Sequence, residues 1–141
     1  VIIANRGSHH GEPLSGRAFE YSPLRSTLSE LTTDPVGVRE TVRTYSQIAG
    51  VAADELQYVV VVLADAARVL AKYESVGPAL ILKHVGAWMQ TMYLCAEDSD
   101  LGVCALGGGP GDVLPRLCGA DIDDPTRAVA VGEMIVAGRA E

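Results

Sequence analysis

The stretch Leu80–Gly109 reads LILKHVGAWMQTMYLC, then AEDSD, then LGVCALGGG, and its apolar residues change period half-way along. In the first part, Gly86 and Ala87 interrupt a bulky apolar face, so another backbone can approach closely there. Apolar residues at steps of three or four predict a long, buried helix, and they are Leu82, Val85, Met89, Met92 and Ala96.

The second part of this stretch, Leu101–Leu106, has the composition of a short buried strand. It runs directly into Gly107, Gly108 and Gly109. A strand that ends in glycines can present backbone N–H groups to a flat or phosphorylated ligand, because no Cβ atom blocks the approach. The run GGGPG is also a strong loop signal, so a plain turn remains an alternative. It matches neither a Walker loop nor a dinucleotide-binding fingerprint.

Strands and helices alternate along the rest of the chain. Strands are expected at Val1–Ala4, Arg17–Ser22, Gln57–Ala64 and Ala128–Ala137, and residues 5–17 read as a loop. Helices are expected at Asp34–Gly50 (apolar face Val38, Val42, Tyr45 and Ile48), Asp65–Ser75, Val76–Asp100 and Gly111–Gly119. The run Gln57–Ala64 is apolar on both faces and suits a central strand. The pattern is that of an α+β protein, with a sheet flanked by helices.

Composition excludes several classes of function. The 141 residues carry a net charge of −7, which argues against a nucleic-acid surface built on clustered lysine and arginine. The sequence contains no basic amphipathic helix of the kind that binds membrane surfaces. The longest apolar runs, Tyr58–Ala64 and Val76–Leu82, are too short to span a bilayer. An apolar content of 48% is ample for a core.

The cysteines and histidines indicate neither disulfides nor a metal site. Cys95, Cys104 and Cys118 are odd in number and lie in apolar surroundings, so we expect buried free thiols in a reducing compartment, the cytoplasm. The adjacent His9 and His10 lack further ligands at metal-binding spacing, so a solvated loop is favoured.

Four blocks of the sequence, in the same order, resemble a known family. Residues 82–94 (LKHVGAWMQTMYL) and 101–109 (LGVCALGGG) are similar to the FMN-dependent dehydrogenases of the SagB type. Residues 71–75 (AKYES) resemble the family's Lys-Tyr motif, and residues 131–136 (VGEMIV) its terminal Val-Gly-Glu-Phe strand. Together the blocks extend over the back half of the family's domain.

The resemblance implies a nitroreductase-like, FMN-dependent fold with a mixed, mainly antiparallel sheet flanked by helices. It implies that residues 1–141 form the C-terminal portion of one flavin-binding domain, incomplete at its N-terminal side. The family's front half, with the Arg/Ser cluster for the flavin phosphate, has no counterpart in Val1–Arg17. A homodimer, or a second chain that supplies the missing half, is therefore expected. Trp88 and Tyr93 are expected to pack at a subunit interface rather than on the flavin.

The resemblance also implies roles for individual residues. The backbone of Gly107–Gly109 would meet the FMN ring edge, with Ala105 and Leu106 setting the approach, and Arg139 would bind the FMN phosphate. Lys72 and Tyr73 would take the proton that leaves the substrate. Without the resemblance, a surface lysine beside a packed tyrosine and an exposed terminal arginine are the ordinary interpretations.

The implied activity is oxidation of thiazolines or oxazolines to azoles in a modified ribosomal precursor peptide, with a cyclodehydratase as a further partner. Two alternatives remain open. One is an NAD(P)H-dependent nitroreductase-type flavoenzyme for small quinones or nitro compounds. The other is a catalytically silent half-domain that is retained for complex assembly.

Overall fold

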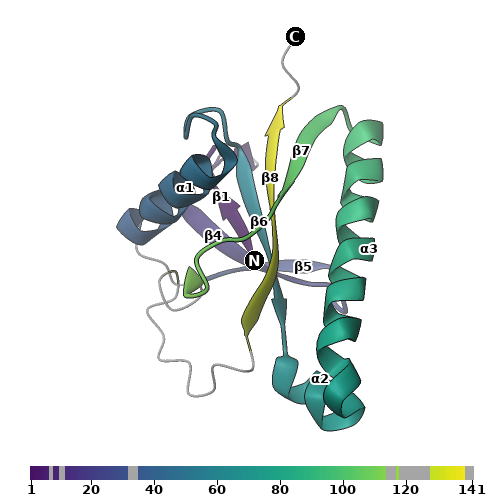
Figure 1. Cartoon of the computed structure of the whole chain (residues 1–141). Helices are drawn as coiled ribbons and strands as arrows, with labels where there is room; N and C mark the ends of the chain where they lie inside the picture. The colour runs from purple at the N-terminus through teal and green to yellow at the C-terminus, as the bar shows by residue number, and fades with distance from the viewer. Residues whose placement is uncertain (7, 10–11, 32–34, 114–116, 118–127, 139–141) are drawn as a thin grey trace.

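The computed structural model describes residues 1–6, 8–9, 12–31, 35–113, 117 and 128–138, which form an open sheet with helices on both faces (Figure 1). The six strands of this sheet lie in the order β5-β4-β1-β6-β8-β7, and every pairing is antiparallel, as in an α+β protein. The elements are β1 (Ile2–Ala4), β2 (Ser8–His9), β3 (Glu12–Pro13), β4 (Arg17–Ser22), β5 (Thr27–Glu30), α1 (Pro35–Ala49), β6 (Tyr58–Ala64), α2 (Ala66–Tyr73), the 3₁₀ turn η1 (Glu74–Val76), α3 (Gly77–Asp98), β7 (Leu101–Leu106) and β8 (Val129–Gly138).

Helix α1 covers one face of the sheet and closes the core. Its buried side chains recur at helical steps, as predicted for Val38, Val42 and Tyr45, but Ile48 is 47% exposed. The helix ends at Gly50, whose φ of 68° suits glycine. The core cluster consists of Ile3, Ala18, Val38, Val42, Tyr45, Leu56, Val59, Val61, Val113, Leu117 and Ile135.

The predicted central strand is confirmed as β6, which lies between β1 and β8. Its residues alternate between the two faces of the sheet, because successive side chains of a strand point in opposite directions. Val59 and Val61 face α1 in the core, whereas Val60 and Val62 line cavities on the opposite face. The β6–β8 register shifts between Val62 and Leu63, so β8 carries an irregularity near Val131.

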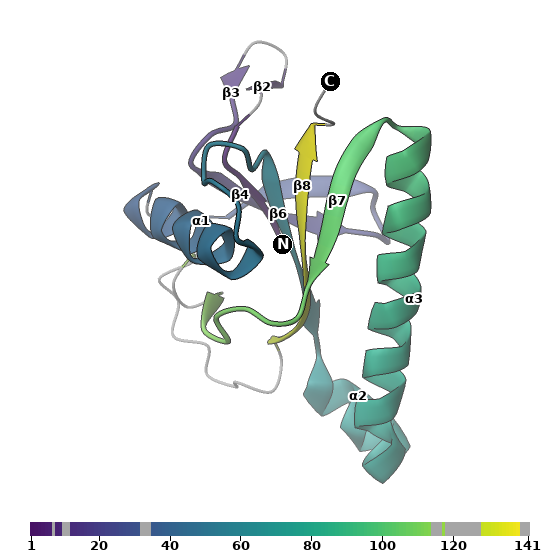
Figure 2. The same cartoon turned by 45° about the horizontal axis from the view of Figure 1, so that its top comes forward.

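The long helix is confirmed as α3, but the prediction that it is buried is wrong. Of the predicted stripe, Val85 and Ala96 are buried, whereas Leu82 is 64% exposed. Helix α3 packs on β7 and β8 with one side only, and its other side is open (Figure 2). Close backbone approach occurs not at Gly86, which has open space around it, but at Gly132 of β8. A Cβ atom on Gly132 would lie 2.5 Å from Val85 Cγ1.

Strand β7 has its predicted limits, but it is an edge strand rather than a buried one. It pairs with β8 on one side and lies beside α3 on the other. The thiols of Cys95 and Cys104 are accordingly exposed, contrary to the expectation of buried cysteines, because neither side chain is covered by a second layer. Cys118 lies outside the described residues.

The remaining predictions concern the two ends of the chain. Residues 5–17 contain a two-stranded pairing of β2 with β3, where a loop was expected. Val113 and Leu117 are helical and buried, as predicted for the short helix. The N-cap Asp34, the side chains of His9 and His10, and residues 114–116 and 118–119 lie outside the described residues, and Gly111 and Asp112 form a turn before Val113.

Candidate functional site

Strands β6 and β7 both run antiparallel to β8, so they end at the same end of the sheet (Figure 1). Strand β6 leads there into α2, which carries Lys72 and Tyr73. Strand β7 leads into Gly107–Gly109. The glycine segment then passes toward α1, where Gly109 lies against Tyr45, whereas α2 packs against α3 on the other face of the sheet. The structure therefore does not bring the two predicted groups of site residues together. No hydrogen bond within the described part of the chain joins them directly.

At two of the three glycines, nothing in the described part of the chain requires glycine. Neither Gly107 nor Gly108 has a positive φ, the backbone conformation that disfavours other residues. A Cβ atom added to either would meet no described atom within 4 Å, and both residues are exposed. Gly109 differs, because a Cβ atom there would lie 2.6 Å from Cε1 of Tyr45. Internal packing therefore requires glycine at position 109 alone.

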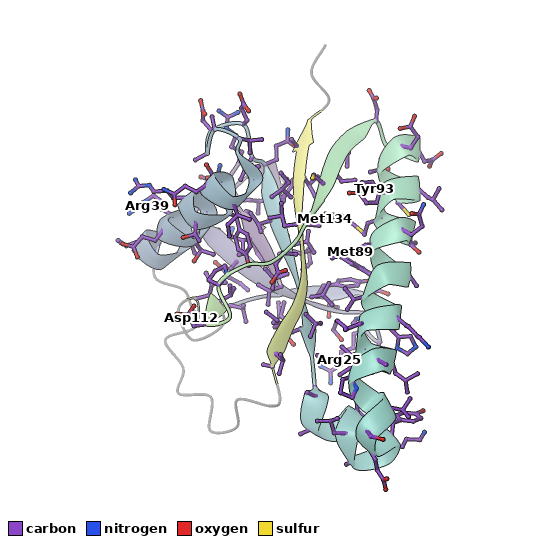
Figure 3. All side chains as sticks on the ribbon, viewed as in Figure 1. Arg25, Arg39, Met89, Tyr93, Asp112 and Met134 are labelled. Carbon is purple, nitrogen blue, oxygen red and sulfur yellow. The ribbon has the colours of Figure 1, made fainter. Side chains whose placement is uncertain are left out.

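The two residues before the glycines are held by the protein itself. The backbone N–H of Ala105 donates to the Tyr93 hydroxyl on α3 at 2.8 Å, on the outer edge of β7 (Figure 3). Leu106 pairs with Glu133 of β8 and packs against the core cluster. Tyr93 therefore ties α3 to the strand that leads into the glycines, a contact that sequence reasoning missed. Through these contacts, Ala105 and Leu106 fix the direction in which the glycine segment leaves the sheet.

Lys72 and Tyr73 lie together on the exposed end of α2. The Lys72 Nζ lies 5.0 Å from the centroid of the Tyr73 ring, a cation–π distance. Adjacent residues in a regular helix diverge by about 100°. Here the helix ends at Tyr73, and Glu74 follows with a φ of 48°, so the backbone is irregular at this point. The amine and the phenol can thus face one ligand.

A buried polar pair lies beneath the glycine segment. The Tyr45 side chain is fully buried, and its hydroxyl has no hydrogen-bond partner among the described residues. Burial raises the pKa of the Tyr45 phenol, and the nearby carboxylate of Glu133 raises it further. Burial likewise raises the pKa of Glu133, which is 6% exposed. The sequence does carry a signal for this buried pair, since Tyr45 lies in an apolar helix stripe and Glu133 in an apolar strand.

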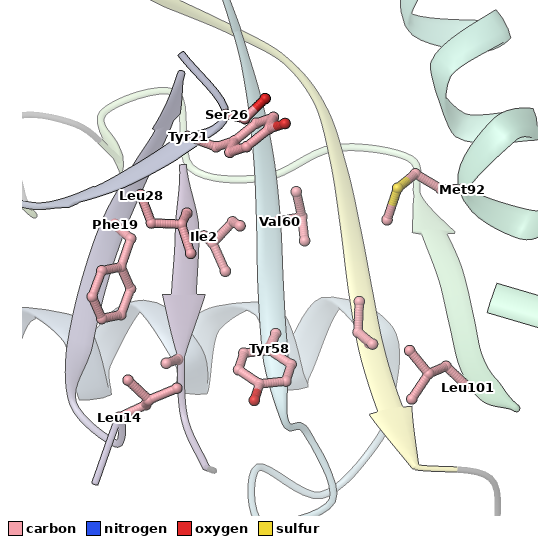
Figure 4. Close-up of a pocket in the computed structure, with 12 residues that line it drawn as sticks. Ile2, Leu14, Phe19, Tyr21, Ser26, Leu28, Tyr58, Val60, Met92 and Leu101 are labelled. Carbon is pink, nitrogen blue, oxygen red and sulfur yellow. The ribbon is translucent and has the colours of Figure 1, made fainter. Parts of the chain in front are cut away.

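Larger concavities lie on the face of the sheet opposite α1. An apolar hollow of about 880 Å³ lies over β1, β4 and β6, bordered by Met92 of α3 (Figure 4). Its floor includes Ile2, Phe19, Tyr58 and Val60. Nothing among the described residues covers this part of the sheet, so a face that a folded protein would ordinarily bury stays open.

The described residues contain neither a group of side chains arranged for a metal ion nor a helix that could span a membrane. They contain no group of three or more histidine, cysteine, aspartate or glutamate side chains arranged for a metal ion. None of their helices is both long enough and apolar enough to span a membrane. Arg139, predicted to bind a phosphate, lies outside the described residues.

Comparison with known proteins agrees with this architecture. The sequence pattern of the nitroreductase family matches residues 16–133, which is most of the chain. The chain belongs to the nitroreductase family. A search of curated proteins gives no match. Family membership makes this an oxidoreductase-type domain of flavoenzyme class, and its α+β antiparallel sheet agrees with that assignment.

Members of the nitroreductase family typically bind FMN. The space beside Gly107 and Gly108 is open, so the backbone there is accessible to a ligand. Their backbone is exposed at the end of an edge strand, where N–H groups can reach a ligand edge-on. The Ala105 N–H is already taken by Tyr93, so Ala105 would support the glycine segment rather than donate.

Proposed function

We propose that this chain is an FMN-dependent dehydrogenase, or the flavin-facing part of one, that oxidises thiazolines or oxazolines of a modified precursor peptide to azoles. The observation that carries the proposal is the pair Gly107 and Gly108. Neither backbone conformation nor packing within the described chain requires glycine there, and the open backbone leaves room for the edge of a ligand ring. Family membership supports a flavin as that ligand.

In this proposal the glycine backbone holds the ring edge of FMN. Leu106 and Ala105 support the segment, and Arg139 binds the phosphate through its forked donors. FMN, when bound, supplies a two-electron acceptor. Tyr93 keeps the preceding strand edge in place by accepting the Ala105 N–H.

Lys72 and Tyr73 are proposed to handle the proton that leaves the azoline ring. Aromatisation removes a proton from one ring atom and a hydride from its neighbour. A base must therefore lie beside the substrate to take the proton. The contact of Lys72 Nζ with the Tyr73 ring, at 5.0 Å, supports joint action, because it holds the amine and the phenol side by side. One residue then accepts the proton while the other orients it.

A second polypeptide is proposed to complete the site, either another copy of this chain or a separate chain, with the cyclodehydratase delivering the peptide. The open apolar hollow over β1, β4 and β6 supports such a partner, as do Leu82 and Leu94, which are 64% and 65% exposed on α3. A cytoplasmic location is proposed with it, since that is where such peptides are assembled.

The decisive experiment separates flavin binding from catalysis. Gly107→Val and Gly108→Val are expected to weaken FMN binding at least tenfold in a flavin-fluorescence titration of the assembled protein, because each branched side chain fills the open space beside the backbone. Gly111→Val is the matched control, since Gly111 also has open space and no positive φ. Unchanged FMN affinity in both loop variants would overturn the flavin assignment.

Catalysis is then tested in the flavin-loaded protein. Lys72→Ala and Tyr73→Phe are expected to keep FMN but to lose azole formation, measured by the mass loss of two hydrogens per ring. The second candidate is a reductase for small quinones or nitro compounds, which the family match itself favours. It would consume NADPH with a nitroaromatic compound and would be insensitive to both changes.

A further inference from the structure

A second cavity, of about 320 Å³, lies where α2 and the first half of α3 cover the end of β6 and the irregular part of β8. Helix α2 folds back against the start of α3 at this end of the molecule (Figures 1 and 2). The volume is at the lower end of the roughly 300–1,000 Å³ that small-molecule sites occupy. The walls are mostly apolar, with Val62 and Val131 from the strands and Val69 and Ile81 from the helices.

One face of α3 forms the long wall of this cavity. Ile81, His84, Val85 and Trp88 line it, at steps of three and four residues, so all four project from the same side of the helix. Trp88 is half-buried and is the single tryptophan of the chain. Indole and isopropyl groups form a surface against which a flat apolar ring can pack.

The polar groups of the cavity are placed at its rim, and they favour an anion. Arg68 of α2 and His84 of α3 are exposed lining residues from different helices. The one acidic lining residue, Asp65, already caps α2, because its Oδ1 accepts the backbone N–H of Arg68 at 3.0 Å. Within the described residues no carboxylate forms an ion pair with the Arg68 guanidinium. Its forked donors therefore remain available for a ligand carboxylate.

We propose that this cavity binds a small planar aromatic carboxylate, with the ring against Trp88 and the aliphatic wall and the carboxylate at Arg68 and His84. An aliphatic acid would forgo the contact with the indole, and a neutral arene would leave the guanidinium unpaired. The proposal does not depend on the flavin assignment, because none of the glycines at positions 107–109 lines the cavity.

The test uses 2-naphthoate as the ligand and naphthalene-2-carboxamide as its neutral match. The single tryptophan gives one indole N–H cross-peak in a ¹H–¹⁵N spectrum, so displacement of this peak on titration reports occupancy at Trp88 directly. We expect saturable displacement by the carboxylate and at least fivefold weaker binding of the carboxamide, which lacks the charge-assisted bond.

Variants of the two helices complete the experiment. Arg68→Met is expected to weaken naphthoate binding on the order of tenfold, as loss of a charge-assisted bond does, with little change for the carboxamide. Arg39→Met removes the same charge from the exposed face of α1, away from the cavity, and should have no effect (Figure 3). If both variants weaken naphthoate binding equally, the effect comes from net charge alone and the proposed site is wrong. An indole peak that does not move would also overturn the site.

Discussion

Burial of the Tyr45 hydroxyl costs free energy, and no hydrogen-bond partner within the described chain offsets this cost. Its hydroxyl is buried and unpaired, so folding removes it from water without supplying a hydrogen bond. Tyr45→Phe keeps the ring that packs on Gly109 and removes the hydroxyl. We expect a change in the free energy of unfolding between zero and about 1 kcal/mol in the stabilising direction, measured by urea denaturation.

The neighbouring residue gives the matched control for this prediction. The Ser46 hydroxyl is also buried, but it donates to the Val51 carbonyl at 2.7 Å. Ser46→Ala should therefore destabilise by about 1 kcal/mol, the usual net value of a hydrogen bond. Destabilisation by Tyr45→Phe of the same size would mean that the phenol has a partner after all.

Glu133 should make stability depend on pH in a particular direction. Burial raises its pKa in the folded state above the ordinary 4.5, so the folded protein holds the proton more tightly than the unfolded chain. Its contribution is fully present below pH 4.5 and is lost as the pH rises through the folded-state pKa. Glu133→Gln lacks this loss, so its stability relative to the parent should rise from pH 4 to pH 8 in urea unfolding series.

Glu30 offers a control of opposite sign. Its carboxylate accepts two hydrogen bonds from Arg17, at 2.7 and 2.5 Å, and these lower its pKa. The stabilisation from this exposed pair is present above pH 4.5 and is lost as the pH falls through the folded-state pKa. Glu30→Gln should therefore cost most at neutral pH and nothing in acid. Two rising profiles would contradict the assignment for Glu30, and two falling profiles the assignment for Glu133.

At the scale of elements, the contact between α3 and the sheet depends on Gly132. A Cβ atom there would lie 2.5 Å from Val85 Cγ1 and 2.9 Å from Met89 Cε, closer than real contacts allow. Gly132→Ala should therefore destabilise by about 1–3 kcal/mol, as overpacking does. Gly86→Ala should instead stabilise the protein by up to about 1 kcal/mol. Gly86 lies inside α3, and a Cβ atom there would meet open space.

Thermal unfolding followed by circular dichroism distinguishes the two glycines. Opposite shifts in the melting temperature are expected, downward for Gly132→Ala and upward for Gly86→Ala. Two downward shifts would mean that Gly86, as the sequence first indicated, does admit a close neighbour, and that this neighbour belongs to another chain.

Periodicity predicted the elements well because it is a local property. The limits of β7, the central place of β6 and the Pro35–Ala49 helix follow from side chains within a few residues of one another. Burial was predicted poorly for α3, β7 and the cysteines, because it depends on which elements stack in space. The Tyr93–Ala105 bond and the cavity under α2 join segments through the tertiary fold, and no spacing in the sequence encodes them.

For the whole molecule, the uncovered sheet face predicts association. Leu28 is 58% exposed and lines the apolar hollow, whereas Leu24 is 98% exposed in the nearby turn and does not line it. A hollow of about 880 Å³ with apolar walls is too large to remain in water without cost. Leu28→Glu should therefore shift sedimentation velocity profiles of the assembly towards smaller species at micromolar concentration. Leu24→Glu removes an equally apolar side chain and should change nothing, because this side chain is almost fully exposed and does not line the hollow. Equal effects of both substitutions would mean that added negative charge, not the hollow, controls assembly.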